Sequence, residues 1–155
     1  MKGELPTEVY AELLFKILGR PKRYRHAVNG YKHENPNASA DEVREFSAQY
    51  YNQLCSTYPI TDRIIHVLEE QVESLPEGPR EVTRYMQGLV DGRPRGRHEV
   101  CQYIYNMETG EYGIPLGAVR DFEYVALRML RHPSRSRRII GTLGDMPADL
   151  RPEKI

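Results

Sequence analysis

The chain has few of the features that mark secreted and membrane proteins. It holds only two cysteines, Cys55 and Cys101, in 155 residues, whereas a small secreted scaffold normally carries more of them, paired as disulfides. Its opening residues lack the apolar stretch of a signal peptide. No apolar run approaches the roughly 20 residues that a membrane helix needs. We therefore expect a soluble cytoplasmic protein without a membrane partner.

The sequence also lacks motifs for metal binding and for catalysis. No Cys-x-x-Cys pair is present, and none of the five histidines has a His or Cys partner at zinc-ligand spacing. A P-loop, a G-x-S-x-G motif and a dinucleotide-binding fingerprint are absent. We therefore expect no catalytic residue, no metal and no cofactor, and the protein is predicted not to be an enzyme. Catalytic residues from distant positions leave no local motif, so an enzyme is kept as a third hypothesis.

The spacing of apolar residues predicts a mainly α fold of about five helices. Ser39 and Glu42 form a capping-box pattern, and Thr61 is placed to cap the helix that follows. Tyr24, Ala27, Val28 and Tyr31 also have helical spacing, which allows a short additional helix that would stop at Asn29-Gly30. The five expected helices cover about 7–18, 39–56, 61–75, 79–90 and 116–131.

One β-hairpin is expected between the fourth and fifth helices, at about 98–114. Residues 100–105 are rich in β formers, residues 106–110 supply turn types, and residues 111–114 form a short return strand. Both faces of this hairpin are rather apolar, so its cover is either the helices of the same chain or a second subunit. We expect one helical domain over 1–133, followed by a basic tail, 134–155, that is partly disordered.

The formal net charge is zero, but the cationic residues are sorted into three blocks, at 20–32, 93–97 and 128–138, that contain no acid. Acidic residues gather elsewhere, notably between Glu69 and Glu81. Such a surface attracts anions on one side of a neutral molecule. Most of the cations are arginine, whose planar guanidinium pairs with phosphate through two hydrogen bonds. A GC-rich or thermophilic genome would also raise the arginine content, although it explains the clustering less well.

The last helix carries the most suggestive pattern. Arg120, Tyr124, Arg128, Arg131 and Arg135 follow one another at spacings of four, four, three and four, and so form one stripe if the helix continues past Pro133. Such a stripe could contact phosphates along a groove. The alternative is a solvated face. The segment 20–26 interleaves cations and a tyrosine in the same way, and its alternative is a basic loop anchored by a buried tyrosine.

The order of elements resembles the layout of winged helix-turn-helix proteins over about Thr61 to Arg131. The resemblance rests on the helix that ends at Gly88-Leu89-Val90, the basic loop 93–97, the hairpin and the long last helix. It implies that the helix 79–90 is the recognition helix, with Arg80, Thr83, Arg84 and Gln87 exposed, and that the loop arginines act as a wing. The chain departs from this layout in one respect, because the turn from Leu75 to Pro79 leaves too little chain for a separate first helix of the motif.

These observations favour a non-catalytic regulatory or accessory protein that binds nucleic acid, either DNA or RNA. The alternative is an adaptor or inhibitor that docks on an acidic protein partner, or a homodimer. The candidate nucleic-acid-binding residues are Arg20, Lys22, Arg23, Tyr24, Arg25, Arg80, Arg84, Gln87, Arg93, Arg95, Arg97, Arg120, Tyr124, Arg128, Arg131, Arg135, Arg137 and Arg138.

Overall fold

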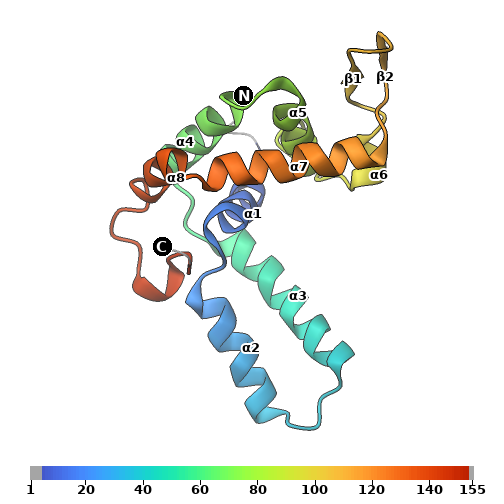
Figure 1. The fold of residues 1–155 in the computed structure, drawn as a ribbon. Coiled ribbons are helices and arrows are strands. Elements are labelled where there is room, and N and C mark those ends of the chain that lie inside the picture. Colours follow the sequence, from blue (N-terminus) through green and yellow to red (C-terminus); the bar gives the residue numbers. More distant parts are fainter. Residues whose placement is uncertain (1–4, 154–155) are drawn as a thin grey trace.

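The computed structural model describes residues 5–153, which fold into a mainly helical protein with one small antiparallel hairpin (Figure 1). The mainly α prediction is confirmed, but the number of helices is larger than expected. The elements are α1 (Thr7–Leu18), α2 (Lys22–Glu34), α3 (Ala40–Thr57), α4 (Asp62–Glu73), α5 (Glu77–Met86), α6 (Arg97–Val100), β1 (Tyr105–Asn106), β2 (Glu111–Tyr112), α7 (Leu116–Arg131), α8 (Pro133–Ile140) and the 3-10 helix η2 (Ala148–Leu150).

Several helix ends lie where local signals predict them. The Ser39 hydroxyl accepts from the backbone of Glu42, and the Glu42 carboxylate accepts from the backbone of Ser39, so the capping box is complete. Thr61 caps α4 through the backbone N–H of Ile64. Helix α1 ends at Gly19, whose φ of 94° favours glycine because the residue has no Cβ.

The main core is built around α1, which α7 crosses in Figure 1. Tyr10, Leu13 and Leu14 of α1 are fully buried, and they pack with apolar residues of α3, α4, α7 and α8. The i, i+3, i+4 spacing of these side chains gives α1 a continuous apolar face. One face of α7 therefore packs against the core, and its other face is exposed to solvent.

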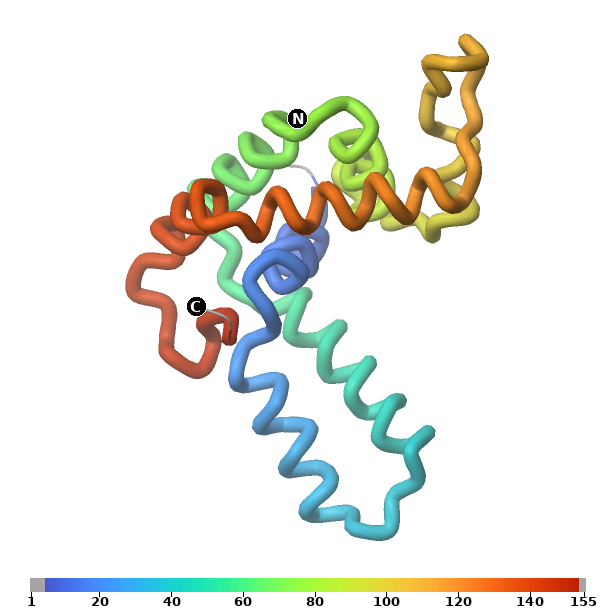
Figure 2. The backbone as a smooth tube through the Cα atoms, in the orientation of Figure 1, coloured from blue at the N-terminus to red at the C-terminus, as the bar shows by residue number. Residues whose placement is uncertain are grey.

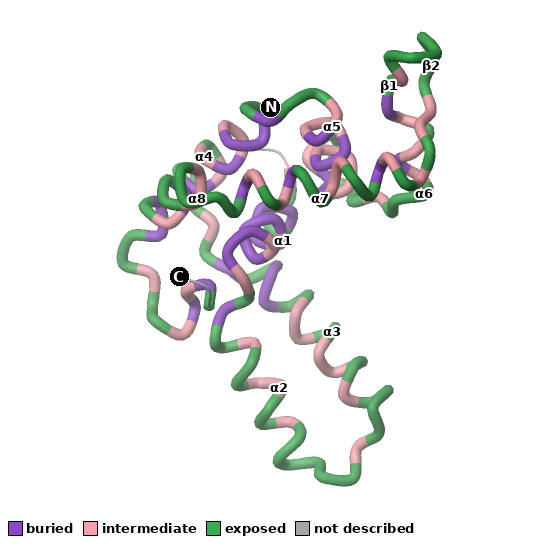
Figure 3. The backbone as a smooth tube through the Cα atoms, viewed as in Figure 1, coloured by how far each residue is buried: buried purple, intermediate pink, exposed green. Residues whose placement is uncertain are grey.

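The helices α2 and α3 form an arm that projects from the core (Figure 2). No residue of α2 is buried, and the distal two thirds of α3 is exposed or half-buried (Figure 3). The two helices contact each other through rings, with Tyr31 stacked on Phe46 at a centroid distance of 4.3 Å. The expected helix in this segment is present but longer than predicted, because it runs through Gly30 to Glu34.

A second, smaller core joins α5, α6 and α7 and consists of Val82, Val100, Ile104 and Val119. The predicted hairpin is present, but its first strand is β1 (Tyr105–Asn106), and the expected strand does not form over residues 100–104. Residues 97–100 form α6, and Val100 and Cys101 donate backbone hydrogen bonds to Gly96 and Arg97. The four-residue spacing of Val100 and Ile104 places both side chains in this core, and that packing overrides the strand propensity of the segment. Only two residues of each strand pair, with Tyr105 opposite Tyr112.

The C-terminal segment, for which the sequence predicts a basic tail, contains the helix α8 and the 3-10 helix η2. Helix α7 ends at Arg131, and His132 in extended conformation caps a new helix, α8, that has Pro133 at its first position. Ile139 is fully buried in the main core, and the hydroxyl of Tyr58 donates to the carbonyl of Leu150 at 2.6 Å. The predicted stripe of basic residues therefore ends at Arg131, because the chain leaves the helix at His132 and Arg135 belongs to α8.

Candidate nucleic-acid interface

The exposed face of α7 carries two arginines and a tyrosine at four-residue spacing. Arg120, Tyr124 and Arg128 all lie on the solvent side, and Tyr124 is 64% exposed. Val119, Ala126 and Leu130 lie on the opposite side and are buried. Neither Arg120 nor Arg128 forms an ion pair or hydrogen bond with any residue in the described range, 5–153. The two guanidinium groups are therefore available to an external anion.

The other arginines at the end of the stripe are used inside the molecule. Arg131 donates through Nε and Nη2 to the carbonyl oxygen of Lys16, at 3.0 and 2.7 Å. The interaction fits the negative C-terminal end of α1. Arg135 donates to the hydroxyl of Ser74, and Arg138 pairs with Glu70 at 2.6 Å. Arg137 is exposed and has no partner among the described residues.

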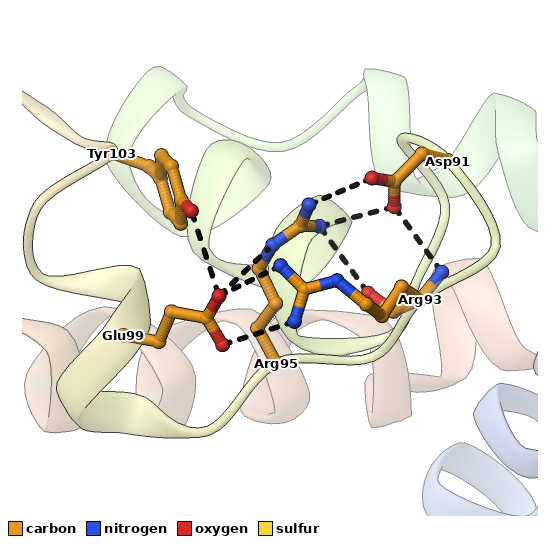
Figure 4. Close-up of polar contacts among 5 residues, drawn as sticks. All are labelled: Asp91, Arg93, Arg95, Glu99 and Tyr103. Carbon is orange, nitrogen blue, oxygen red and sulfur yellow. Dashed lines mark hydrogen bonds and ion pairs between the residues drawn. The ribbon is translucent and has the colours of Figure 1, made fainter.

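The middle basic block is tied into a network of ion pairs (Figure 4). The guanidinium of Arg93 donates to both carboxylate oxygens of Glu99, at 2.7 and 3.3 Å. The guanidinium of Arg95 likewise donates to both carboxylate oxygens of Asp91, at 2.7 and 3.1 Å. The Arg95 side chain is only 8% exposed, and its guanidinium lies over the ring of Tyr85 at 5.5 Å. Hydrogen bonds from Arg95 and Arg93 lower the pKa of Asp91 and Glu99, respectively.

The third member of this block, Arg97, pairs with Glu123 of α7 at 2.7 Å. All three arginines of the block thus fix the loop after α5 to α6 and α7. Their geometry shows an internal structural role, and nucleic-acid contact by these residues stays a prediction.

The expected exposure of the α5 face is wrong. Thr83 and Gln87 are buried, at 6% exposure each, because α5 is packed against α4, α6 and α7. Arg84 lies 3.6 Å from both Glu73 and Glu81, and Arg80 lies 3.5 Å from Glu81. The winged-helix layout is not confirmed, since the helix that it assigned to the groove has little free surface.

The first basic block lies at the base of the arm. Arg23 pairs with Asp149 and Arg25 with Glu153, both at 2.7 Å. Lys22 is exposed without a described partner, and Tyr24 is half-buried. The Arg20 guanidinium lies over the rings of Tyr24 and Tyr51, at 4.8 and 4.9 Å.

Two of the three blocks meet. Arg20 and Arg131 line one hollow of about 350 Å³ at the C-terminal end of α1, together with Lys16 and Glu12. The middle block lies at the other end of α7, and a 16-residue helix spans about 24 Å. The basic surface therefore extends from α7 toward the start of α2, and the middle block does not lie at this junction.

No protein-family model and no solved structure matches the chain. The chain is 30% identical over 140 residues to the RNA polymerase sigma factor SigA of Listeria monocytogenes, and equally to that of Listeria innocua. It is 39% identical over 72 residues to the RNA polymerase sigma factor SigA of a Bacillus species.

The chain is similar to part of a sigma factor. The Listeria matches cover 88% of this chain and 32% of each relative, so the chain spans about a third of their length. The Bacillus match covers 46% of this chain and 17% of the relative. A continuous match over 88% of the chain includes α5, α6 and α7 wherever it begins, so the segment with the exposed basic helix belongs to the similar part.

The sequence pattern predicts the helix α7 but not the short helix α6, which the structure places between the basic loop and the hairpin. The signal that could have found α6 is the four-residue spacing of Val100 and Ile104 after Gly96, read with a helical rather than an alternating period. With α6 in place, a short helix precedes the exposed helix α7, separated by the segment 101–115 that contains the hairpin.

Proposed function

We propose that this chain is a non-catalytic DNA-binding domain of the bacterial transcription machinery and that α7 is its DNA-contacting helix. The observation that carries the proposal is the exposed row of Arg120, Tyr124 and Arg128, in which both guanidinium groups lack a described partner. The similarity to proteins named RNA polymerase sigma factors supports DNA over RNA as the nucleic acid.

The proposed binding mode places α7 in the major groove, which is wide enough to admit an α-helix. In helix-turn-helix proteins it is the N-terminal residues of the inserted helix that contact base edges. Arg120 and Tyr124, in the N-terminal half of α7, would then contact bases. Arg128, two turns further along than Arg120, would contact a phosphate.

The adjoining basic surface extends the same footprint. Lys22, Arg20 and Arg137 are exposed, and Arg20 lines the hollow that also contains Arg131. These side chains would add sequence-independent phosphate contacts, which release counterions from DNA. Binding is therefore expected to weaken steeply as salt rises.

The test is fluorescence anisotropy of short labelled DNA duplexes, titrated with the full chain at several salt concentrations. Arg128→Ala is expected to lower the slope of log affinity against log salt by about 1, and Arg120→Ala to cost about 1–3 kcal/mol and relax sequence preference. Arg63→Ala is the matched control, because Arg63 is exposed on α4 and also lacks a described partner. Absence of binding at low salt, or an equal effect of all three variants, would contradict the proposal.

A second function, docking on a protein partner, is favoured by α2. No residue of this helix is buried, and residues 22–33 include cations but no acid, with Glu34 as the one acidic residue of the helix, at its end. The relatives are by name factors of RNA polymerase, so we infer that an acidic surface of RNA polymerase is the partner.

Capture of purified RNA polymerase after nuclease treatment tests this second function. The double variant Lys22→Glu/Lys32→Glu is expected to lose the polymerase, whereas Arg120→Ala is expected to retain it. Retention by the double variant would rule out α2 as the docking surface.

A further inference from the structure

A cavity of about 690 Å³ lies between α5, the β-hairpin and the start of α7. Its size is within the range of small-molecule sites. The lining residues Tyr105, Met107 and Tyr112 are exposed, so the cavity is reached from solvent on the side of the hairpin. The hairpin itself projects from the molecule (Figure 1). The aromatic residues that line it are Tyr85, Tyr103, Tyr105, Tyr112 and Phe122.

The charges that line this cavity are all negative. Glu77, Glu81 and Glu108 contribute carboxylates, and no Lys, Arg or His is among the lining residues. Arg80 and Arg84 lie near Glu81 and offset its charge. Glu77 and Glu108 form no ion pair within residues 5–153. These two full charges outweigh the roughly half positive charge at each of the two helix N-termini beside the cavity.

The rings of the hairpin are free to receive a ligand. Tyr105 and Tyr112 form a corner, with their centroids 5.4 Å apart and their planes at 76°. They are 43% and 73% exposed, and the neighbouring Met107 is 78% exposed. Such large apolar side chains gathered on one projecting element are unusual on a surface that contacts only water.

Two other rings that line the cavity already bind a cation from the chain itself. Tyr85 and Tyr103 are stacked 5.1 Å apart, and the Arg95 guanidinium lies 5.5 and 5.2 Å from their centroids. The face of an aromatic ring attracts cations through its quadrupole. The structure therefore shows that rings of this cluster accept a guanidinium, while Tyr105 and Tyr112 have none in the described chain.

We propose that this cavity binds a small organic cation, in which a quaternary ammonium or guanidinium group is attached to an apolar body. The cation lies against Tyr105 and Tyr112 and faces the carboxylates of Glu77 and Glu108, while the apolar body contacts Phe122 and Ile114. The assignment uses the cavity alone and does not depend on DNA binding by α7.

The test uses benzyltrimethylammonium as the probe, with benzyl alcohol and benzoate as neutral and anionic comparisons. Binding to the full chain is measured by isothermal titration calorimetry and by amide chemical shifts. The cation is expected to bind saturably, to shift amides of the hairpin and of α5, and to bind at least about tenfold more tightly than either comparison. No saturable shift with the cation, or equal binding of benzyl alcohol, would overturn the proposal.

Substitutions of exposed residues test where the cation binds, because they leave the buried core of the protein unchanged. Tyr105→Leu and Tyr112→Leu keep apolar bulk and are expected to weaken the cation by about two- to fivefold each, and Glu108→Gln is expected to weaken it and reduce its salt dependence. The matched controls are Tyr124→Leu and Glu111→Gln, which are exposed but do not line the cavity. Equal effects of the cavity variants and the controls would place the binding elsewhere and so contradict the assignment.

Discussion

Arg97 of α6 and Glu123 of α7 form an ion pair in which Nη2 and Nε of the arginine approach one carboxylate oxygen, at 2.7 and 2.9 Å. The two residues are separated by the whole hairpin segment, and no other ion pair within residues 5–153 joins these two helices. The pair therefore acts together with the apolar contacts of Val100 and Val119 to set how α6 lies on α7.

A double-mutant cycle with Arg97→Ala and Glu123→Ala is expected to give a coupling free energy of about 0.5–1 kcal/mol, toward the upper end for pairs at a surface because Glu123 is mostly covered. Urea unfolding of the four proteins measures it. A cycle between Arg63 of α4 and Glu123, which form no ion pair or hydrogen bond with each other within residues 5–153, serves as the control and should give no coupling. Equal coupling free energies in the two cycles would mean that the ion pair of Arg97 and Glu123 does not stabilise the folded protein.

Acid should weaken the network formed by Asp91, Arg93, Arg95 and Glu99. The pKa of both carboxyls is lowered in the folded protein, by the hydrogen bond from Arg95 to Asp91 and by that from Arg93 to Glu99. Their stabilising effect is complete above the ordinary values of 3.8 and 4.5 and is lost as the pH falls through the lower folded-state values. We expect the denaturation midpoint to decline below about pH 4.5.

The double variant Asp91→Asn/Glu99→Gln should have a flatter pH profile, measured by urea unfolding between pH 7 and pH 3. Asp121→Asn is the control, because Asp121 is exposed and has no described partner. A profile of the double variant that is parallel to that of the parent protein would show that this network does not contribute to acid sensitivity.

Gly88 is required where α5 ends. Its φ is +74°, Leu89 donates to the carbonyl of Arg84, and Gly88 donates to that of Tyr85, which is the Schellman pattern. A Cβ at Gly88 would also lie 2.9 Å from the backbone nitrogen of Pro94. Gly88→Ala is therefore expected to destabilise the protein by more than about 1 kcal/mol, through strain and a backbone clash.

Gly30→Ala is the matched comparison for thermal or urea unfolding. Gly30 lies inside α2, and a Cβ there would meet nothing within 4 Å. This substitution should stabilise the helix by about 0.5–1 kcal/mol. The contrast would fail if the two alanine variants changed stability in the same direction.

The two thiols should react at very different rates. Burial raises the pKa of the Cys55 thiol from 9.0 to about 11, whereas Cys101 is half-exposed. The thiolate is the reactive form, so this shift alone lowers the reactive fraction of Cys55 about a hundredfold at pH 8. Titration with a disulfide reagent should show one fast thiol in the folded protein and two after unfolding, and Cys101→Ser should remove the fast phase. A fast phase that survived in Cys101→Ser would place Cys55 within reach of solvent.

The parts of the fold that could be predicted depend on signals within a few residues. The capping box at Ser39, the cap at Thr61 and the boundaries of α7 all follow from local sequence, and the structure confirms them. The short helices α6 and α8 have much weaker local signals, and for α6 the signal is only the four-residue spacing of Val100 and Ile104. Their stability comes from buried contacts of Val100 and Ile139 with helices far away in the sequence.

The arginine blocks show the same limit at the candidate site. The sequence identifies where the cations lie, but it does not identify their partners, since Asp149 is 126 residues from Arg23 and Glu123 is 26 residues from Arg97. Those pairs depend on the tertiary arrangement. The free cations on α7 could be recognised only after the paired ones had been identified in the structure.

The arm of α2 and α3 has a consequence for the energetics of the whole chain. Helix α2 buries no residue, adheres to α3 mainly through half-exposed rings, and forms only surface ion pairs with Asp149 and Glu153. Opening it therefore costs little of the free energy that holds the main core together. We expect its amide protons to exchange with solvent through local opening, well before those of α1, whose residues are mostly buried. A partner that binds this arm would thus also order it, and part of the binding energy would be consumed in doing so.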